Sequence, residues 1–318
     1  MAGVVEAAGV RVAWDDLPAH VRAVVADVLG APVVAAVSQP GGFSPGSADR
    51  VRTADGRRAF VKAVSGSVNP HSPGLHRREI GVAAALPANV PAPRLLGSHD
   101  DGDWVVLVLT DVEGRHPRLP WEPAELEAVR QALDRVAEVP LTGGLGRLGG
   151  TGPGFADDFA GWHRLREEPS ATLDDWATRH LLRLGEAADR AEAVLAGDRL
   201  VHGDVRADNL LVRPDGSVVV VDWPWATRGA GWFDRLALLV NVGLYDADAP
   251  LDDLLARWLP DVAPDDVDAV LSGLAAYFVD AARRPDPPGL PTVRAFQRAQ
   301  GAVVLHWLRR RWSIGSRA

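Results

Sequence analysis

The stretch NLLVRPDGSVVVVDW, residues 209–223, constrains the fold most strongly, because a polar turn joins two apolar runs within it. The dipeptide Asp-Gly between the runs is typical of a tight turn, so the sequence predicts a β-hairpin. Such a hairpin brings Asn209, at the start of one strand, close to Asp222, at the end of the other. Asp204 lies just before them, so we expect two carboxylates and an amide at one edge of a buried hairpin.

The residues around this hairpin suit magnesium and phosphate chemistry. The oxygens of Asn209 and Asp222 are hard ligands of the kind that Mg²⁺ takes together with water and phosphate oxygens. Asp204 would then be free to accept the proton of a hydroxyl that attacks a γ-phosphate, and Arg206 would neutralise phosphate charge. We expect His202 to orient the loop by hydrogen bonds. A plain polar turn explains any one of these residues, but not the spacing H-x-D-x4-N followed by an apolar strand that ends in Asp.

The chain has one lysine, Lys62, in a composition that otherwise uses arginine for its basic residues. In the strand RRAFVKAV the alternation places Lys62 on a face with apolar neighbours, where a buried ammonium needs a partner. Glu79 is the natural candidate, because helical spacing puts it on the apolar face of the following helix. A Lys–Glu pair of this kind suits the phosphates of a nucleotide. The alternative is a surface lysine on an edge strand.

The segment GGFSPGS, residues 41–47, precedes the lysine strand. Small residues let backbone N–H groups approach an anion closely, and the hydroxyls of Ser44 and Ser47 would add donors to phosphate. The alternative is an ordinary β-turn.

The order of the predicted elements indicates an α+β fold with two lobes. A helix over residues 15–30 comes first, and a five-stranded antiparallel sheet with one inserted helix fills about the first 110 residues. The remainder is mostly helical, apart from the hairpin and a Gly-rich segment, residues 142–154, that we expect to be a flexible loop. We therefore predict an N-terminal lobe (1–110), a hinge (111–114) and a C-terminal lobe (115–318).

The bulk properties of the sequence exclude several classes of protein. A net charge of −8 argues against nucleic-acid binding, and the absence of cysteine excludes thiolate catalysis and cysteine-based zinc sites. The N-terminal residues lack the pattern of a signal peptide, and no apolar run approaches the length of a membrane span, roughly 20 residues. We expect a cytoplasmic protein with no membrane partner.

With these motifs in their order, the sequence resembles the aminoglycoside phosphotransferase family, small-molecule kinases with the protein-kinase fold. HGDVRADN is similar to the catalytic loop of that family, VVDW to its second metal-ligand segment, FVKAV to its lysine strand, RREIGVAAAL to the helix with the glutamate partner, and WVVLVLTDVEG to the hinge. The resemblance implies ATP and Mg²⁺ as cofactors and a small-molecule hydroxyl as acceptor. It implies these roles: Asp204 as catalytic base, Asn209 and Asp222 as magnesium ligands, Lys62 with Glu79 at the α- and β-phosphates, and Thr110 to Val112 at adenine.

Some features refine or depart from that resemblance. Asp234 matches the acidic residue that braces the catalytic loop, and we also expect it to be an N-cap that stabilises its own helix. Trp223 stands where protein kinases have Phe, and the interval from Asp222 to Asp234 is too short for an activation loop that docks a peptide. A protein substrate is therefore disfavoured.

The acceptor is the least determined part of the prediction. Asp157, Asp158, Asp174 and Asp175 are candidates for binding an aminoglycoside, although each is also a plausible helix cap or surface acid. The run Arg309 to Arg311 would repel aminosugars if it faced the cleft. The alternatives are an antibiotic kinase, a kinase for a sugar or a choline-like amino alcohol, and, in another class, a catalytically silent nucleotide-binding regulatory protein.

Overall fold

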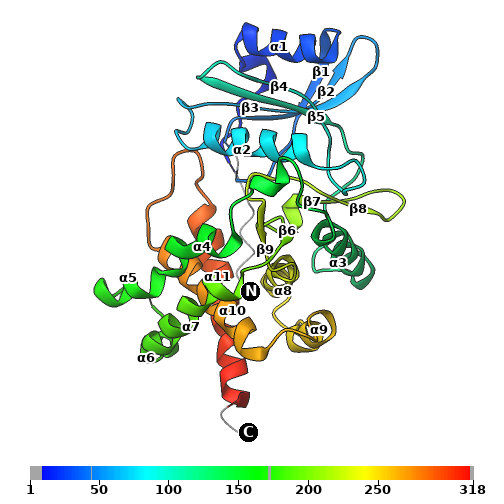
Figure 1. Cartoon of the computed structure of the whole chain (residues 1–318). Coiled ribbons are helices and arrows are strands. Elements are labelled where there is room, and N and C mark those ends of the chain that lie inside the picture. Colours follow the sequence, from blue (N-terminus) through cyan, green and yellow to red (C-terminus); the bar gives the residue numbers. More distant parts are fainter. Residues whose placement is uncertain (1–8, 44, 171–172, 316–318) are drawn as a thin grey trace.

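The computed structural model describes residues 9–43, 45–170 and 173–315, so Ser44 lies outside the described residues. A five-stranded antiparallel sheet forms the N-terminal lobe, with strand order β1-β2-β3-β5-β4 (Figure 1). The strands are β1 (Val33–Ser38), β2 (Ser47–Thr53), β3 (Arg58–Ser65), β4 (Leu95–Asp100) and β5 (Trp104–Thr110). Strands β3 and β5 lie in the middle of the sheet, and their valines are buried on both faces.

One helix covers each face of this sheet. Helix α1 (Ala19–Leu29) packs on the outer face through Val21, Val25 and Leu29, and α2 (Ser72–Ala85) crosses the face that looks toward the helical lobe (Figure 1). Helix α1 is shorter than the predicted 15–30, because Pro18 stands directly before it and a separate 3₁₀ turn, η1 (Trp14–Asp16), precedes the proline.

The C-terminal lobe is built mainly of helices around the pair α10 and α11. Helix α10 packs against both α7 and α11, and this packing forms the largest hydrophobic core of the described residues. The helices of this lobe are α3 (Pro123–Ala137), η2 (Leu145–Arg147), α4 (Thr151–Phe159), α5 (Gly161–Glu167), α6 (Asp175–Arg179), α7 (Leu181–Val194), η3 (Ala207–Asn209), α8 (Phe233–Tyr245), α9 (Leu251–Trp258), α10 (Pro264–Ala282) and α11 (Val293–Gly315).

Two small hairpin-like sheets sit at the top of this lobe. The predicted hairpin is present as β7 (Leu210–Val212) and β8 (Val218–Val220), with Asn209 in the 3₁₀ turn η3 rather than in the strand. A second pair, β6 (Arg199–Val201) with β9 (Thr227–Gly229), was not predicted, because these short strands are distant in the sequence and no turn joins them.

The Gly-rich segment 142–154 is only partly a loop. Its residues from Thr151 onward begin α4, so the expectation of a flexible loop is wrong there. A Cβ atom on Gly152 would lie 2.2 Å from the carbonyl oxygen of Glu192 in α7. Gly152 therefore allows two helices to approach closely and does not provide flexibility.

The hinge and a segment on the other side of the cleft both connect the lobes. Residues 111–114 connect β5 to the helical lobe, and Asp111 is bound there by Arg50 and Arg58 of the sheet, each at 2.7 Å. On the other side of the cleft the segment 283–292 rises from the end of α10 and returns to α11 (Figure 1). Its Pro288 oxygen accepts a hydrogen bond from Asn69 Nδ2 at 2.8 Å, and its Gly289 oxygen accepts one from the backbone N–H of Val10, also at 2.8 Å.

The fold class is therefore the predicted one, α+β with a sheet lobe and a larger helical lobe. Within the described residues, every helix is too short or too polar to cross a membrane.

Candidate active site

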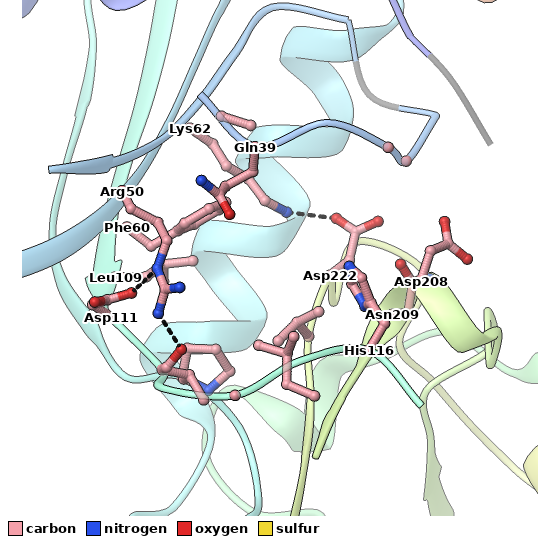
Figure 2. Close-up of a pocket in the computed structure, with 18 of the residues that line it drawn as sticks. Gln39, Arg50, Phe60, Lys62, Leu109, Asp111, His116, Asp208, Asn209 and Asp222 are labelled. Carbon is pink, nitrogen blue, oxygen red and sulfur yellow. Dashed lines mark hydrogen bonds and ion pairs between the residues drawn. The ribbon is translucent and has the colours of Figure 1, made fainter. Parts of the chain in front are cut away.

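Lys62 joins the two lobes at the centre of the cleft. Its Nζ lies 2.8 and 2.7 Å from the two carboxylate oxygens of Glu79 and 2.5 Å from Oδ1 of Asp222 (Figure 2). Burial disfavours the charged lysine, but the carboxylates of Asp222 and Glu79 outweigh that effect and raise the pKa of Lys62. The predicted Lys–Glu pair is present, and the lone lysine is buried rather than on an edge strand.

The loop before the hairpin is held by an interlocking set of hydrogen bonds. Asp234 accepts the backbone N–H groups of His202 and Gly203 at 2.7 and 3.0 Å. The His202 ring donates from Nε2 to the Val221 oxygen at 3.0 Å, and its Nδ1 accepts the backbone N–H of Asp204 at 3.3 Å. Burial lowers the pKa of His202, so the ring is neutral in this arrangement. Both residues act as supports of the loop.

The position of Asp234 differs from the prediction in one respect. It lies in the first turn of α8, whose N-cap is Trp232, and its carboxylate binds the catalytic loop instead of capping its own helix. The N-cap expectation is therefore wrong, because the two backbone N–H groups of the loop have taken both carboxylate oxygens.

Asp204 and Arg206 are bound to each other. Arg206 Nη1 lies 2.5 and 2.6 Å from the two oxygens of Asp204, while Nε and Nη2 donate to Asp208 at 3.0 Å. Asn209 Nδ2 donates to Asp204 Oδ2 at 3.1 Å. Burial raises the pKa of Asp204 to about 6, although Arg206 opposes the rise. Arg206 thus reaches the site as expected, with its charge already matched by two carboxylates.

Asn209 and Asp222 fit a magnesium ion that is also bound by phosphate. The Asn209 amide nitrogen is used by the backbone oxygen of Asp204 at 2.8 Å, which leaves the amide oxygen as the ligand atom. Asp222 has φ 67°, the only positive value for a residue other than glycine in the described part of the chain, and it follows β8 directly. Among the described residues, no three His, Asp or Glu side chains are placed so that they could hold a metal ion by themselves. An ion at Asn209 and Asp222 would therefore need further ligands from substrate and water.

A cavity of about 370 Å³ opens beside these residues, between the sheet and the hairpin (Figure 2). Its apolar walls include Phe60, Leu109, Leu211 and Val221, and its outer end is closed by Arg50. Thr110 and Val112 line it, as predicted, but the Val112 carbonyl oxygen accepts a hydrogen bond from Arg50 Nη2 at 2.7 Å. A flat aromatic group between apolar walls, with phosphates toward Lys62, fits this shape.

Comparison with known proteins decides the family. Residues 43–270, more than half of the chain, match the sequence pattern of the group described as "Phosphotransferase enzyme family". The chain belongs to the phosphotransferase enzyme family. As a member of this family it is an enzyme that transfers phosphate to a hydroxyl group, so the predicted family and enzyme class are confirmed.

Solved structures show the same kinase-like fold for this phosphotransferase. The GDP and kanamycin complex of APH(2")-IIia superposes with a TM-score of 0.63 at 13% identity, covering 93% of this chain and 99% of that one. A thermostable mutant of aminoglycoside phosphotransferase APH(4)-Ia, with ADP and hygromycin B, gives 0.57 at 14% identity, with coverage of 91% and 97%. The aminoglycoside phosphotransferase from Alicyclobacillus acidocaldarius gives 0.53 at 16% identity, with coverage of 85% and 91%.

A curated relative is mouse "Acyl-CoA dehydrogenase family member 10", 27% identical over 205 residues. The match covers 58% of this phosphotransferase but only 18% of the mouse protein, so the chain spans less than a fifth of that relative.

The prediction that the serines of the segment 41–47 donate to phosphate does not hold for Ser47, and Ser44 lies outside the described residues. Ser47 lies on the face of β2 opposite to the cavity, and its hydroxyl donates to the buried carboxylate of Asp49. It is the backbone of Gly41 and Gly42 that lines the cavity. Gly46 has φ 108°, and a Cβ there would lie 2.5 Å from the Ala63 oxygen, so the loop depends on a glycine at this position.

The acidic residues predicted to bind an aminoglycoside do not line the cavities that Lys62 and Asp204 line. Asp174 is the N-cap of α6 (Asp175–Arg179), which is the alternative that the sequence left open for it. The Asp157 side chain is 95% exposed and is paired with Arg164 at 3.3 Å. Asp158 is partly buried, and this burial, followed by the charge of Asp157, raises its pKa.

Of the predicted run Arg309 to Arg311, Arg310 binds Asp252 at 3.2 Å and Arg311 binds Asp268 at 2.5 Å, both within the helical lobe. Arg309 lines a separate cavity of about 740 Å³ in that lobe, which neither Lys62 nor Asp204 lines.

Sequence reasoning missed two residues of the phosphate region. Arg11 lines the cavity of about 370 Å³, donates a hydrogen bond to the Gly41 oxygen and interacts electrostatically with Asp222. Its burial lowers its pKa, against the effect of Asp222. Phe43 packs edge-on against Phe296 of α11, with ring centroids 5.2 Å apart. Neither residue stands in a helix or a patterned strand, so periodicity gave no signal for them.

Proposed function

We propose that this phosphotransferase moves the γ-phosphate of ATP, with Mg²⁺, to a hydroxyl of a small molecule. The observation that carries the proposal is the position of Asp204 and Asn209 relative to two cavities. Asn209, Asp222 and Lys62 line the larger cavity, whereas Asp204 lines a second, smaller one. Asp204 does not line the larger cavity and faces the space where a second substrate would sit.

The nucleotide would lie in the larger cavity. Its base would lie between the apolar side chains of Phe60 and Leu211, within reach of the hinge at Thr110 and Val112. The triphosphate would extend toward Lys62, Arg11 and the backbone of Gly41 and Gly42. The solved structures that share this fold include complexes with ADP and GDP, which supports a nucleotide in this place.

The side chains present can perform the transfer. Mg²⁺ held by Asn209 and Asp222 would neutralise charge on the phosphate oxygens. The acceptor oxygen forms a bond to the γ-phosphorus while the bond from that phosphorus to the bridging β–γ oxygen breaks. Asp204 takes the proton of the acceptor hydroxyl, and the products are ADP and a phosphate monoester. Most of the rate gain would come from positioning and charge stabilisation.

The test is ADP release by the purified chain with ATP, Mg²⁺ and a panel of small alcohols. We expect Asp204→Asn to bind nucleotide as the parent does and to lose about 10²- to 10⁴-fold in kcat, the range for a lost general base. Equal turnover by parent and variant would remove Asp204 from its role. Tight nucleotide binding without turnover on any acceptor would favour a regulatory nucleotide-binding protein instead.

A further inference from the structure

A small cavity lies beside Asp204, between the segment 41–47 and the helices α4, α8, α10 and α11. Its volume is about 100 Å³, well below the roughly 300–1,000 Å³ of common ligand pockets, so it admits a compact molecule or the reacting end of a larger one. Its walls are mainly aromatic and aliphatic: Phe43, Phe155, Phe233, Leu274, Phe278 and Phe296.

The two charged side chains of this wall are paired with each other, and Arg206 also binds Asp208 outside the wall. Among the described residues that line the cavity, only Asp204 and Arg206 are charged, and they are bound to each other at 2.5 Å. Asp157 and Asp158 do not line it. An ammonium group of a bound aminosugar would find no unpaired carboxylate here, and burying it without a partner costs several kcal/mol, of order 10²-fold or more in affinity. The cavity is thus unsuited to a polycation.

Neutral hydrogen-bonding groups supply the polarity of the cavity. Gln297 donates from Nε2 to the Tyr277 hydroxyl oxygen at 3.0 Å, and its Oε1 accepts from Arg294 at 2.8 Å. Because the Tyr277 oxygen already accepts, its own proton is available to a ligand. Burial, with the charges of Asp158 and Asp204, raises the pKa of Tyr277 to about 12, so the hydroxyl stays protonated.

Gln300 is the second polar group of the wall. Its residue is only 8% exposed and lines the cavity, and neither atom of its amide belongs to the buried polar atoms that lack a partner. The amide is therefore accessible from the cavity, where it can bind a neutral donor or acceptor of a ligand.

We propose that the acceptor of this phosphotransferase is an uncharged alcohol on a compact ring, whose hydroxyl meets Asp204 while Tyr277 and Gln300 bind its neutral polar groups. The inference rests on the proposed function and narrows its acceptor. Aromatic walls favour the flat faces of a ring, and the neutral amide and hydroxyl bind uncharged polar groups without the loss that a buried ammonium suffers. Phe43, from the segment 41–47, contacts Phe296 and lines this cavity.

The experiment compares neutral and cationic acceptors in the ADP-release assay, with Asp204→Asn as the blank. The neutral set is 4-hydroxybenzyl alcohol, myo-inositol and uridine, and the cationic set is kanamycin, choline and 4-(aminomethyl)benzyl alcohol. We expect kcat/KM for the best neutral acceptor to exceed that for every cationic one by about tenfold or more. Preference for a cationic acceptor would overturn this inference and leave the proposed function standing. Silence with every acceptor would overturn both.

Two variants test the residues that carry the inference. Gln300→Glu places a carboxylate in the wall and should lower kcat/KM for the neutral acceptor while raising it for 4-(aminomethyl)benzyl alcohol. Gln131→Glu, on the exposed face of α3, is the matched control and should change neither. Tyr277→Phe should raise KM for the neutral acceptor about tenfold, the worth of one good hydrogen bond, with KM for ATP unchanged. Equal acceptor KM values in the parent, Gln300→Glu and Tyr277→Phe would overturn the assignment.

Discussion

Lys62 of the sheet lobe and Asp222 of the helical lobe form an ion pair across the cleft, with Nζ and Oδ1 2.5 Å apart. Because Glu79 holds the same ammonium from the other side, the lysine stem has a fixed direction before any phosphate arrives. When a nucleotide binds with its metal, its phosphates would replace part of the contact between Lys62 and Asp222. The lysine is thus positioned before the nucleotide arrives, but the Asp222 carboxylate competes with the phosphates for its ammonium group.

Replacing the lysine by arginine should damage nucleotide use despite the retained charge. The space between Glu79 and Asp222 fits a compact ammonium, and a planar guanidinium would displace one of them. We expect Lys62→Arg to lower kcat/KM for ATP by about 10²-fold, the scale of one lost electrostatic contact at a reacting phosphate. Arg57→Lys, in an exposed pair with Asp55, is the control and should have the activity of the parent. Unchanged kinetics for Lys62→Arg would mean that the lysine is replaceable.

The activity should depend on pH through Asp204. The base works only when ionised, and its pKa is about 6, so kcat/KM for the acceptor should fall as the pH is lowered through that value. Arg206 lowers this pKa, so Arg206→Met should shift the acid limb of the profile to higher pH. The measurement is a pH–rate profile of both proteins from pH 5 to 9. A limb that stays in place in Arg206→Met would assign it to another group.

Arg11 should contribute to nucleotide binding more than to the chemical step. It lines the larger cavity beside Gly41 and feels the charge of Asp222, where the phosphates would lie. We expect Arg11→Met to raise KM for ATP about tenfold with kcat nearly unchanged, as for the loss of one charge-assisted hydrogen bond. Arg52→Met, on an exposed position of β2, should leave KM as it is. A larger loss in kcat than in KM would contradict this assignment.

The close approach of α4 and α7 should make Gly152 sensitive to a single methyl group. Gly152→Ala would place its Cβ 2.2 Å from the Glu192 oxygen, so the helices must move apart. We expect a loss of about 1–3 kcal/mol in the free energy of unfolding, measured by urea denaturation. Gly149→Ala is the paired control, because a Cβ there meets nothing within 4 Å. Similar stabilities of the two variants would contradict a packing role for Gly152.

The parts of the site that sequence could predict are those set by local pattern. Lys62 and Glu79 follow from strand alternation and helical spacing, and Asn209 and Asp222 from a hairpin whose turn is evident. The face of Ser47 could not be predicted in the same way, because a two-residue turn at Asp55-Gly56 would pair Ser47 with Val64, on the face of Lys62, whereas the structure pairs Ser47 with Ala63, on the opposite face.

The remaining residues depend on packing between distant segments. Arg11 enters the cavity because its extended segment lies beside Gly46, and Gln300 faces Asp204 because α11 packs on α10. No local periodicity carries such information. The same holds for Asp157, which lies in α4 with its side chain exposed to solvent.

The segment 283–292 ties the lobes on the side away from the hinge, through Asn69 and Val10. A rotation about residues 111–114 that admits a nucleotide must therefore release this segment or carry α10 and α11 with it. Those two helices also supply Leu274 and Gln300 to the smaller cavity. A shift of this segment would therefore change both the contact between the lobes and the shape of the smaller cavity.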